Sequence, residues 1–360
     1  METMEPRTAL LIGALCVGIA FGAVSRLSAF CFRSAVLELL ARRVGFQVLA
    51  WIAAIALAVA LTQGLAYFEI VDLSESIYLG TSLAWLSIAT GGVIFGIGMI
   101  LARGCGARHM VLLAGGNLRS AIVLSVLGIT AYMTLRGILA IPRTTLEELG
   151  TLDLAAFDLD SQALPAIIGV EEAGLVIAAL LVVATIAMFI KRRGERLALS
   201  AALTGMAIGL LIASGWYVTG VIGFDEFEPV RTQSLTFTAP VGNAIQYLMT
   251  YTGASADFGI VAVAGVILGA FAIAVVRGQW HLEGFETPHQ LLRYVGGGAL
   301  MGFGGVLALG CTVGAGISGV STLSIGSILA IISILGGAFI GDILVRRDFA
   351  PRPQEVLPAE

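Results

Sequence analysis

Apolar segments long enough to cross a lipid bilayer recur along the whole chain, and they constrain the fold more than any other feature. Of the 360 residues, 58% are hydrophobic and 12% are charged, and the mean hydropathy is +0.97. A soluble domain carries about 25% charged residues. Because the bilayer core has no water to pair with backbone groups, such segments cross it as α-helices. The sequence therefore predicts an all-α polytopic membrane protein.

The apolar pattern divides the chain into about nine transmembrane helices and four shorter segments that are expected to dip into the membrane. The predicted spans are 8–29, 45–67, 83–102, 119–140, 168–190, 197–215, 257–276, 294–309 and 325–345, and the short segments are 33–42, 106–116, 239–252 and 312–322. We expect residues 1–360 to form a single integral membrane domain that ends in a Pro-rich cytoplasmic tail, 348–360.

The charges between the spans predict their orientation. Four connections are basic, with Arg42 and Arg43, Lys191, Arg192, Arg193 and Arg196, Arg277, and Arg346 and Arg347. The connections at 69–75, 147–160 and 225–228 are acidic. The positive-inside rule places every basic cluster in the cytoplasm, with the N-terminus outside and the C-terminus inside. These clusters lie beside helix ends and form no stripe, so no nucleic-acid partner is expected.

Two glycine-rich segments that end at a cysteine are copies of each other. GGVIFGIGMILARGC (91–105) and GGALMGFGGVLALGC (297–311) share 8 of 15 residues at a constant offset of 206. The first copy runs inward and the second outward, so the sequence predicts an inverted-topology repeat with pseudo-two-fold symmetry, over about 8–140 and 197–345. Paired broken helices in such repeats indicate the binding site of a transporter. A weaker match of 18–22 with 205–209 would set Cys31 opposite Val218.

The segments at the two breaks combine flexibility with anion-binding potential. Irregular backbone at membrane depth is tolerated only where it is buried or lines a cavity. Glycine lets the chain turn and lets N–H groups approach a ligand. The glycines at the breaks are Gly104, Gly106 and Gly310. A helix that begins after the break offers free N–H groups and a partial positive charge to an anion. Expected N-caps are Asn117 after the first break and Ser321 or Ser324 after the second.

The cysteines suggest what the breaks bind. The duplicated context favours a functional role for Cys105 and Cys311, with Thr312 beside them, whereas Cys31 has no repeat partner and is equally consistent with packing. A thiol is a weak donor, which suits a soft sulfur anion that must also be released. Three thiolates could instead bind a soft metal such as Cu(I). The spacing has no metal-site pattern, so we expect no metal and no cofactor.

Other polar residues near the breaks leave two interpretations open. Arg26, Arg103 and Arg108 are charges within or beside spans, which are usually functional, but each could extend its charge to the membrane interface. We expect His109 to be an interfacial polar residue and Cys16 to be a packing residue of the first span.

Four stretches of the chain resemble the YeeE/YedE sulfur-transport family. They are SRLSAFCFRSAV (25–36), GIGMILARGCGARHMVLLAGGNLRS (96–120), GWYVTGVIGFDEFEP with SLTFTAPVG (215–242), and GGVLALGCTVGAGISGVSTLSIGS (304–327). The resemblance implies thiosulfate uptake across the bacterial inner membrane. It implies that Cys31, Cys105 and Cys311 contact the substrate in succession through S–H···S hydrogen bonds. It also implies an hourglass-like fold and a separate, TusA-like cytoplasmic sulfur-carrier partner.

Three alternatives remain at the level of sequence. The substrate could be another sulfur or selenium compound. The protein could be a membrane thiol enzyme, for which His109 is the nearby histidine that could activate a thiolate. It could also be a soft-metal permease. The family resemblance favours a transporter with no catalytic residues, and therefore not an enzyme.

Overall fold

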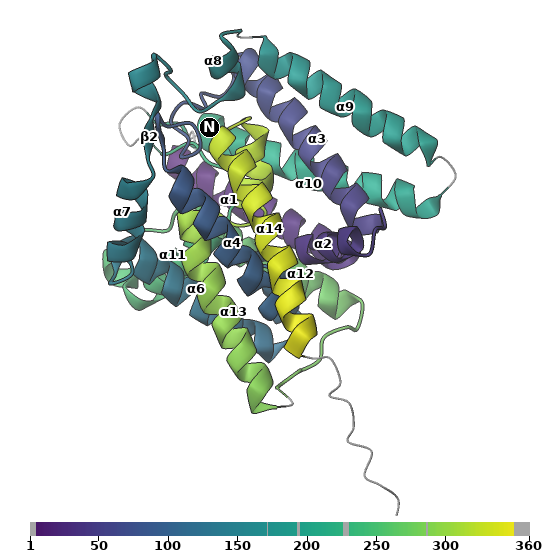
Figure 1. Ribbon diagram of the computed structural model, residues 1–360. Helices are drawn as coiled ribbons and strands as arrows, with labels where there is room; N and C mark the ends of the chain where they lie inside the picture. The colour runs from purple at the N-terminus through teal and green to yellow at the C-terminus, as the bar shows by residue number, and fades with distance from the viewer. Residues whose placement is uncertain (1–4, 171, 193–194, 226–229, 286, 349–360) are drawn as a thin grey trace, which may run out of the picture.

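The computed structural model describes residues 5–170, 172–192, 195–225, 230–285 and 287–348, and these residues are almost entirely helical (Figure 1). Several predicted features lie outside the described residues. They are the loop charges Arg193, Glu226 and Glu228, and the predicted tail beyond Asp348.

Nine long helices form the body of the described part of the chain. They are α1 (Pro6–Ser28), α3 (Phe46–Tyr67), α4 (Trp85–Leu101), α6 (Leu118–Arg136), α9 (Ala173–Lys191), α10 (Arg196–Tyr217), α12 (Phe258–Val276), α13 (Pro288–Leu307) and α14 (Ile325–Asp348). Eight helical segments of the described residues are long and apolar enough to cross a membrane. The other long helix, α13, begins with the polar residues His289, Gln290 and Arg293, which shorten its apolar part. The protein is an all-α polytopic membrane protein.

Short elements fill the junctions between the long helices. The short helices are α2 (Phe32–Leu40), α5 (Gly106–Ala114), α7 (Ala140–Leu149), α8 (Leu164–Ile168) and α11 (Thr238–Met249); the π-helices are η2 (Val218–Ile222) and η4 (Gly314–Gly319); the 3-10 turns are η1 (Leu154–Phe157) and η3 (Tyr251–Gly253). Strands β1 (Ser82–Leu83) and β2 (Leu152–Asp153) pair antiparallel, with Ser82 opposite Asp153. The four predicted membrane-dipping segments coincide with α2, α5, α11 and η4.

The two copies of the glycine-rich motif pack against each other at the centre of the molecule. Early in α4, Gly91 lies against Leu307 and Ala308 at the end of α13. Late in α4, Gly98 lies against Gly297, which is in the middle of α13. The two helices are therefore antiparallel, as the inverted repeat requires. Their close approach depends on glycine, because a side chain at either position would meet the opposite backbone.

Several other contacts between helices occur in matching pairs. Helix α14 packs on α4, and its counterpart α6 packs on α13. In the same way, α12 packs on α1, and α3, the counterpart of α12, packs on α10. Likewise α2 packs on α3 as α11 packs on α12. In this pairing α11 is the counterpart of α2. Cys31, the N-cap of α2, then lies opposite Phe237, the N-cap of α11. The sequence comparison that set it opposite Val218 was wrong, because η2 and the loop after it lengthen the second copy.

An extended segment covers the chain after each duplicated break. On one side, Glu283 donates its N–H to Gly116 O (3.1 Å) and accepts from the Leu118 N–H (2.9 Å). On the other side, the Leu164 N–H donates to Leu323 O (3.0 Å) and Gln162 O accepts from the Ile325 N–H (3.1 Å). These bonds satisfy backbone groups that helix ends would otherwise leave unpaired inside the protein.

The centre of the molecule is closed by large aromatic side chains, whereas Cys16 lies outside this core. Phe21 and Phe95 are fully buried, and the rings of Phe21 and Phe237 are 5.2 Å apart. Cys16 is exposed on the outer face of α1. The prediction that it is a packing residue was wrong, because an apolar sequence context does not distinguish a protein-facing from a lipid-facing position.

Adjacent glycines on α14 test the close packing of α14 on α4. A Cβ at Gly337 would clash with Val93 O, whereas a Cβ at Gly336 would meet nothing within 4 Å. We expect Gly337→Ala to lower the free energy of unfolding by about 1–3 kcal/mol. Gly336→Ala should be neutral or stabilising by up to about 1 kcal/mol, because alanine has the higher helix propensity. Thermal unfolding in detergent measures both, and equal melting temperatures would contradict the packing described.

Candidate functional site

The three buried cysteines occupy the same local position in three helix breaks. Two residues before Cys31, Cys105 and Cys311, the backbone adopts the left-handed conformation, at Ala29 (φ 52°), Arg103 (φ 62°) and Leu309 (φ 58°) respectively. A left-handed residue commonly ends a helix, although glycine usually occupies that position. Each break therefore ends one helix, turns the chain, and presents a cysteine just before the next helical segment. The sequence reveals the duplication of two breaks, but only the structure shows that the third shares their geometry.

The cysteines leave helix N–H groups without a capping side chain. Cys31 and Cys105 are the N-caps of α2 and α5, and neither helix receives a side-chain hydrogen bond at its start. Ser, Thr, Asp or Asn would normally accept from these N–H groups. At the third break, Cys311 Sγ accepts weakly from the Gly314 N–H at 3.4 Å. Each break thus combines a thiol with N–H donors, and such donors favour an anion.

The three thiols lie close enough to interact. Cys105 interacts electrostatically with both Cys31 and Cys311, and its thiol also contacts the Thr312 side chain. The exposed fractions of the three cysteines are 5%, 3% and 1% in chain order. Among the residues that the structure describes, no group of three His, Cys, Asp or Glu side chains is arranged to hold a metal ion. Cys105 is therefore a neighbour of both other thiols, and we call the three the thiol series.

A glutamine that sequence analysis missed fixes the first break. Gln47 Oε1 accepts from the Cys31 N–H (3.0 Å), and Gln47 Nε2 donates to Ala29 O (3.0 Å). The carboxylate of Glu38 in α2 accepts from the N–H groups of Gln47 and Val48, at 3.2 and 2.9 Å. Glu38 thereby caps α3, which carries Gln47. This arrangement determines where the Cys31 thiol points.

Three aromatic side chains lie around Cys31. The Trp51 ring stacks on Phe30 and meets the edge of Phe32, with both centroid distances 4.8 Å. Trp51 Nε1 is buried and has no hydrogen-bond partner. Thr312 Oγ1 is also buried, and its contact is with the Cys105 thiol. An unpaired buried polar group costs about 1–3 kcal/mol, so these groups are candidates to contact a passing polar ligand.

An arginine next to Cys31 is the second residue that sequence analysis missed. Arg33 interacts electrostatically with Cys31, Arg103, Tyr294 and Asp342, and it is more than half buried. Its position two residues after Cys31 in the first break could have indicated its role. The exposed Arg103 lies near it. The structure thus places two guanidinium groups at the Cys31 side of the thiol series.

The predicted supporting residues divide into two groups. Gly104, Gly106, Gly310, Thr312 and Arg103 lie at the breaks themselves. Arg108 contributes its backbone to the surroundings of Cys105, while its side chain lies near Arg26. Arg26 donates to Gln279 O (3.2 Å).

Asn117 accepts from the Ser120 N–H (3.1 Å), which confirms the predicted cap. The second cap was predicted wrongly, because Ser321 Oγ donates to Ser318 O and Ser324 Oγ has no partner.

His109 is buried in the protein and does not lie at an interface, contrary to the prediction. Its exposed fraction is 1%, and its Nδ1 pairs with Ser120 Oγ at 3.0 Å. Its ring lies against Gly104 and meets Tyr294 edge-on, with centroids 6.2 Å apart. Its place inside the turn of the break explains the burial, so we interpret His109 as a structural support for the Cys105 break.

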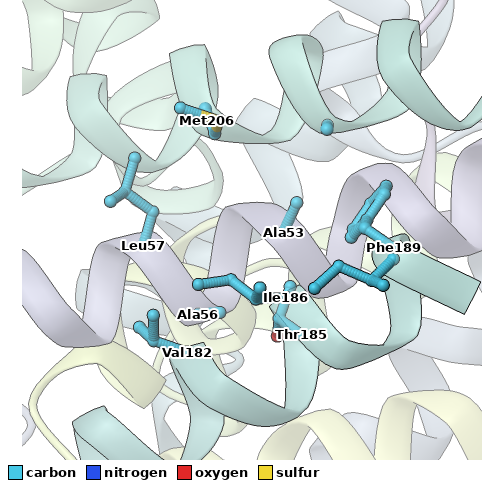
Figure 2. A pocket seen from close by; sticks show the side chains of 10 residues that line it. Ala53, Ala56, Leu57, Val182, Thr185, Ile186, Phe189 and Met206 are labelled. Atoms are coloured by element: carbon cyan, nitrogen blue, oxygen red, sulfur yellow. The ribbon is translucent and has the colours of Figure 1, made fainter. Parts of the chain in front are cut away.

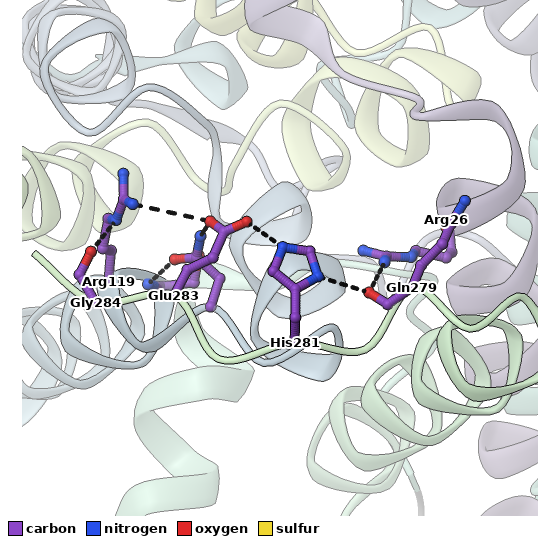
Figure 3. A network of polar contacts seen from close by, with 8 residues as sticks. Arg26, Arg119, Gln279, His281, Glu283 and Gly284 are labelled. Carbon is purple, nitrogen blue, oxygen red and sulfur yellow. Dashed lines mark hydrogen bonds and ion pairs between the residues drawn. The ribbon is translucent and has the colours of Figure 1, made fainter.

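A polar network anchors the segment that covers the first duplicated break (Figure 3). Glu283 accepts from Asn117 Nδ2 (2.5 Å), pairs with His281 Nε2 (2.6 Å), and lies 4.0 Å from Arg119. His281 Nδ1 contacts Gln279 O (3.2 Å), which also accepts from Arg26. Arg26 and Asn117 therefore act in this anchoring network.

Hydroxyl groups surround the thiol at the other end of the series. Tyr78 interacts with Cys311 and forms a hydrogen bond with the Thr236 side chain. Burial raises the pKa of Tyr78, so the phenol keeps its proton. Thr236 in turn packs on Gly314, the residue whose N–H approaches Cys311. The Cys311 side of the series is thus neutral and polar, whereas the Cys31 side is cationic.

Removing the Gln47 side-chain hydrogen bonds should expose Cys31. We expect Gln47→Leu to destabilise the first break by about 1–3 kcal/mol, because it leaves two buried backbone groups unpaired. Local opening should then make alkylation of Cys31 by a maleimide roughly tenfold faster or more, as measured by peptide mass spectrometry.

Gln63→Leu is the matched control, because Gln63 bonds Ser321 O instead. An unchanged Cys31 rate in Gln47→Leu would contradict the role assigned to Gln47.

Comparison with known proteins agrees with this architecture. The sequence model of the sulphur transport family (Sulf_transp) matches residues 27–340. The thiosulfate transporter TsuA of Escherichia coli is 25% identical over 328 residues, which cover 86% of each chain. The thiosulfate transporter TsuA of Spirochaeta thermophila is 26% identical over 342 residues, which cover 92% of this chain and 98% of the relative. The family match includes all three breaks and both copies of the glycine-rich motif, and the chain belongs to the sulphur transport family.

Proposed function

We propose that this protein takes up thiosulfate across the bacterial inner membrane, along a path on which Cys31, Cys105 and Cys311 contact the ion in succession. The main support is the series of three buried thiols, each in a helix break of the same geometry. The curated relatives that match most of the chain are named as thiosulfate transporters. In this proposal the protein is a transporter and performs no catalytic step.

Thiosulfate combines a soft terminal sulfur atom with a charged sulfonate group, and the site offers partners for both. A thiol S–H group donates a weak hydrogen bond, which suits the soft sulfur atom. The N–H groups at the starts of α2 and α5, the unpaired Trp51 Nε1 and the Thr312 hydroxyl can donate to the oxygen atoms. Donors that are already desolvated pay no further desolvation cost when the ion arrives.

The weakness of each contact is an advantage for transport. Conduction requires that each site bind the ion well enough to admit it, and weakly enough to release it to the next site. Because Cys105 interacts with both other cysteines, an ion at Cys105 could reach the next thiol before it leaves the first. A single metal-like cluster of thiols would bind more tightly and release more slowly.

We infer the orientation of the path in the membrane from the positive-inside rule. The N-terminus is then periplasmic and the C-terminus cytoplasmic. In this orientation, the hydroxyl-rich side near Cys311 faces the periplasm and the side with Arg33 and Arg103 faces the cytoplasm. A cationic group at the inner end would attract the anion along the path. A separate TusA-like carrier protein would receive sulfur at the cytoplasmic face, as the family resemblance suggests.

Single replacements of the three cysteines test the proposed path. We expect Cys31→Ala, Cys105→Ala and Cys311→Ala each to reduce uptake of labelled thiosulfate. The loss of one donor in a dry passage costs about 1–3 kcal/mol, or roughly 5- to 150-fold in rate. Uptake is measured in cells that lack other sulfur importers and is normalised to the amount of protein in the membrane.

Cys16→Ala is the matched control, because Cys16 is exposed outside the core. Normal uptake in all three core variants would reject the thiol path. If the unaltered protein takes up no thiosulfate, assays of other sulfur anions, selenium compounds and Cu(I) distinguish the alternative substrates. A persulfide on Cys105 or Cys311 after exposure to substrate would support an enzyme instead.

Arg33 provides a test of the charge at the Cys31 side. We expect Arg33→Gln to raise the KM for uptake several-fold, because it removes a partly buried positive charge beside Cys31. Arg33→Lys keeps the charge and should retain more activity. Arg136→Gln, which removes an exposed charge at the end of α6, should have no effect. Equal KM values for Arg33→Gln and Arg136→Gln would contradict the proposed role of Arg33.

A further inference from the structure

An apolar groove opens on the membrane-facing side of the molecule, away from the thiol series. It lies between α3, α9 and α10 and has a volume of about 520 Å³ (Figure 2). Its walls include Ala53 and Ala56 of α3, Ile186 and Phe189 of α9, and Ala202 and Met206 of α10. Thr185 is the one lining residue whose side chain carries a hydroxyl group. Water gains little in such a groove, so its occupant in a bilayer is hydrocarbon.

The groove exists because α9 packs closely on the rest of the protein near its start, and again near its end through Met188 and Phe189, but less closely between these contacts. Gly174 and Ala178 are the buried residues described in α9, and Ala178 joins a small cluster with Val59 and Leu323. Farther along, Ile186 and Ile190 are 53% and 61% exposed. Opposite them, alanines at positions 53, 56 and 202 leave space that larger side chains would fill. Figure 1 shows α9 at the edge of the molecule beside α3.

Basic residues cluster where the groove ends. Phe189 and Ile190 line this end, and Lys191 and Arg192 follow them directly. Arg196 opens α10, and Arg42 and Arg43 lie in the connection before α3. A hydrogen bond from Arg192 Nη1 to Val44 O (3.0 Å) joins the two connections.

The acids near this cluster offset only part of its charge. Glu195 forms an ion pair with Arg192 at 3.9 Å, and Glu38 caps α3, so the basic residues remain in excess.

We propose that this groove is a binding site for an anionic phospholipid. One acyl chain lies between α9 and the α3–α10 pair, and the phosphate group faces the basic cluster formed by Arg42, Arg43, Lys191, Arg192 and Arg196. The groove provides the apolar contact and the cluster provides charge complementarity, because each basic residue near a membrane surface attracts anionic lipid. The lining residues extend from this cluster to the middles of α3, α9 and α10, where Leu57, Val182 and Met206 lie, so the lipid belongs to the leaflet at that end. The proposal does not depend on the substrate.

Native mass spectrometry of the full-length protein tests the site with phosphatidylglycerol and phosphatidylcholine of identical acyl chains. We expect phosphatidylglycerol to bind at least about tenfold more tightly. The triple variant Arg42→Gln, Arg43→Gln, Lys191→Gln should lose this preference, whereas Arg136→Gln should keep it. Ala202→Leu should reduce the binding of both lipids by filling the groove, whereas Ala187→Leu, at an exposed position of α9 outside the groove, should not.

Three outcomes would overturn the proposal. They are equal binding of the two lipids by the unaltered protein, an undiminished phosphatidylglycerol preference in the triple variant, and full lipid occupancy in Ala202→Leu. A stable dimer that excludes lipid from the groove would also overturn it, since a second copy would then be the occupant. The single variants Arg42→Gln and Lys191→Gln give a graded comparison if the triple variant fails to fold, and their melting temperatures identify such failure.

Discussion

The structure depends on one constraint: backbone N–H and C=O groups at membrane depth must find partners within the protein. Three helices are broken inside the molecule, and each break leaves such groups without their regular partners. These backbone groups find different partners at the three breaks. Gln47 satisfies the break at Cys31, and extended segments around Glu283 and Gln162 satisfy the chain after the other two breaks. The starts of α2 and α5 lie beside the thiols and have no capping Ser, Thr, Asp or Asn side chain.

The pseudo-two-fold arrangement determines where the site lies. Departures from this symmetry make the two ends of the site chemically different. The antiparallel pair of α4 and α13 brings two breaks of the same geometry to the centre. Cys31 corresponds to Phe237 in the other half, so one half has a thiol where the other has an aromatic ring. Arg33 and Arg103 add charge on the Cys31 side, while Tyr78 and Thr236 add hydroxyl groups near Cys311. The proposed path therefore has unlike ends, although the two halves of the protein are similar.

Much of the fold could be predicted from the sequence, because apolar length and the positions of glycine reflect local physics. All nine predicted spans correspond to long helices, and the copied glycine pattern predicted that α4 and α13 run in opposite directions. Features that depend on which way a residue faces could not be predicted. Cys16 faces outward and His109 is buried, although both lie in or beside apolar segments. Gln47 was missed because its role comes from a contact with Cys31 across 16 residues of the chain, whereas the position of Arg33 two residues after Cys31 could have indicated its role.

The deep burial of the three thiols has a consequence for the electrochemical gradient across the membrane. With exposed fractions of 1–5%, the cysteines lie where the described side chains fill the centre, which leaves little room there for a continuous column of water. Protons move between compartments along such columns, and an unbroken one would dissipate the electrochemical gradient. A centre sealed by thiols and aromatic rings therefore keeps the membrane electrically insulating while the protein is at rest.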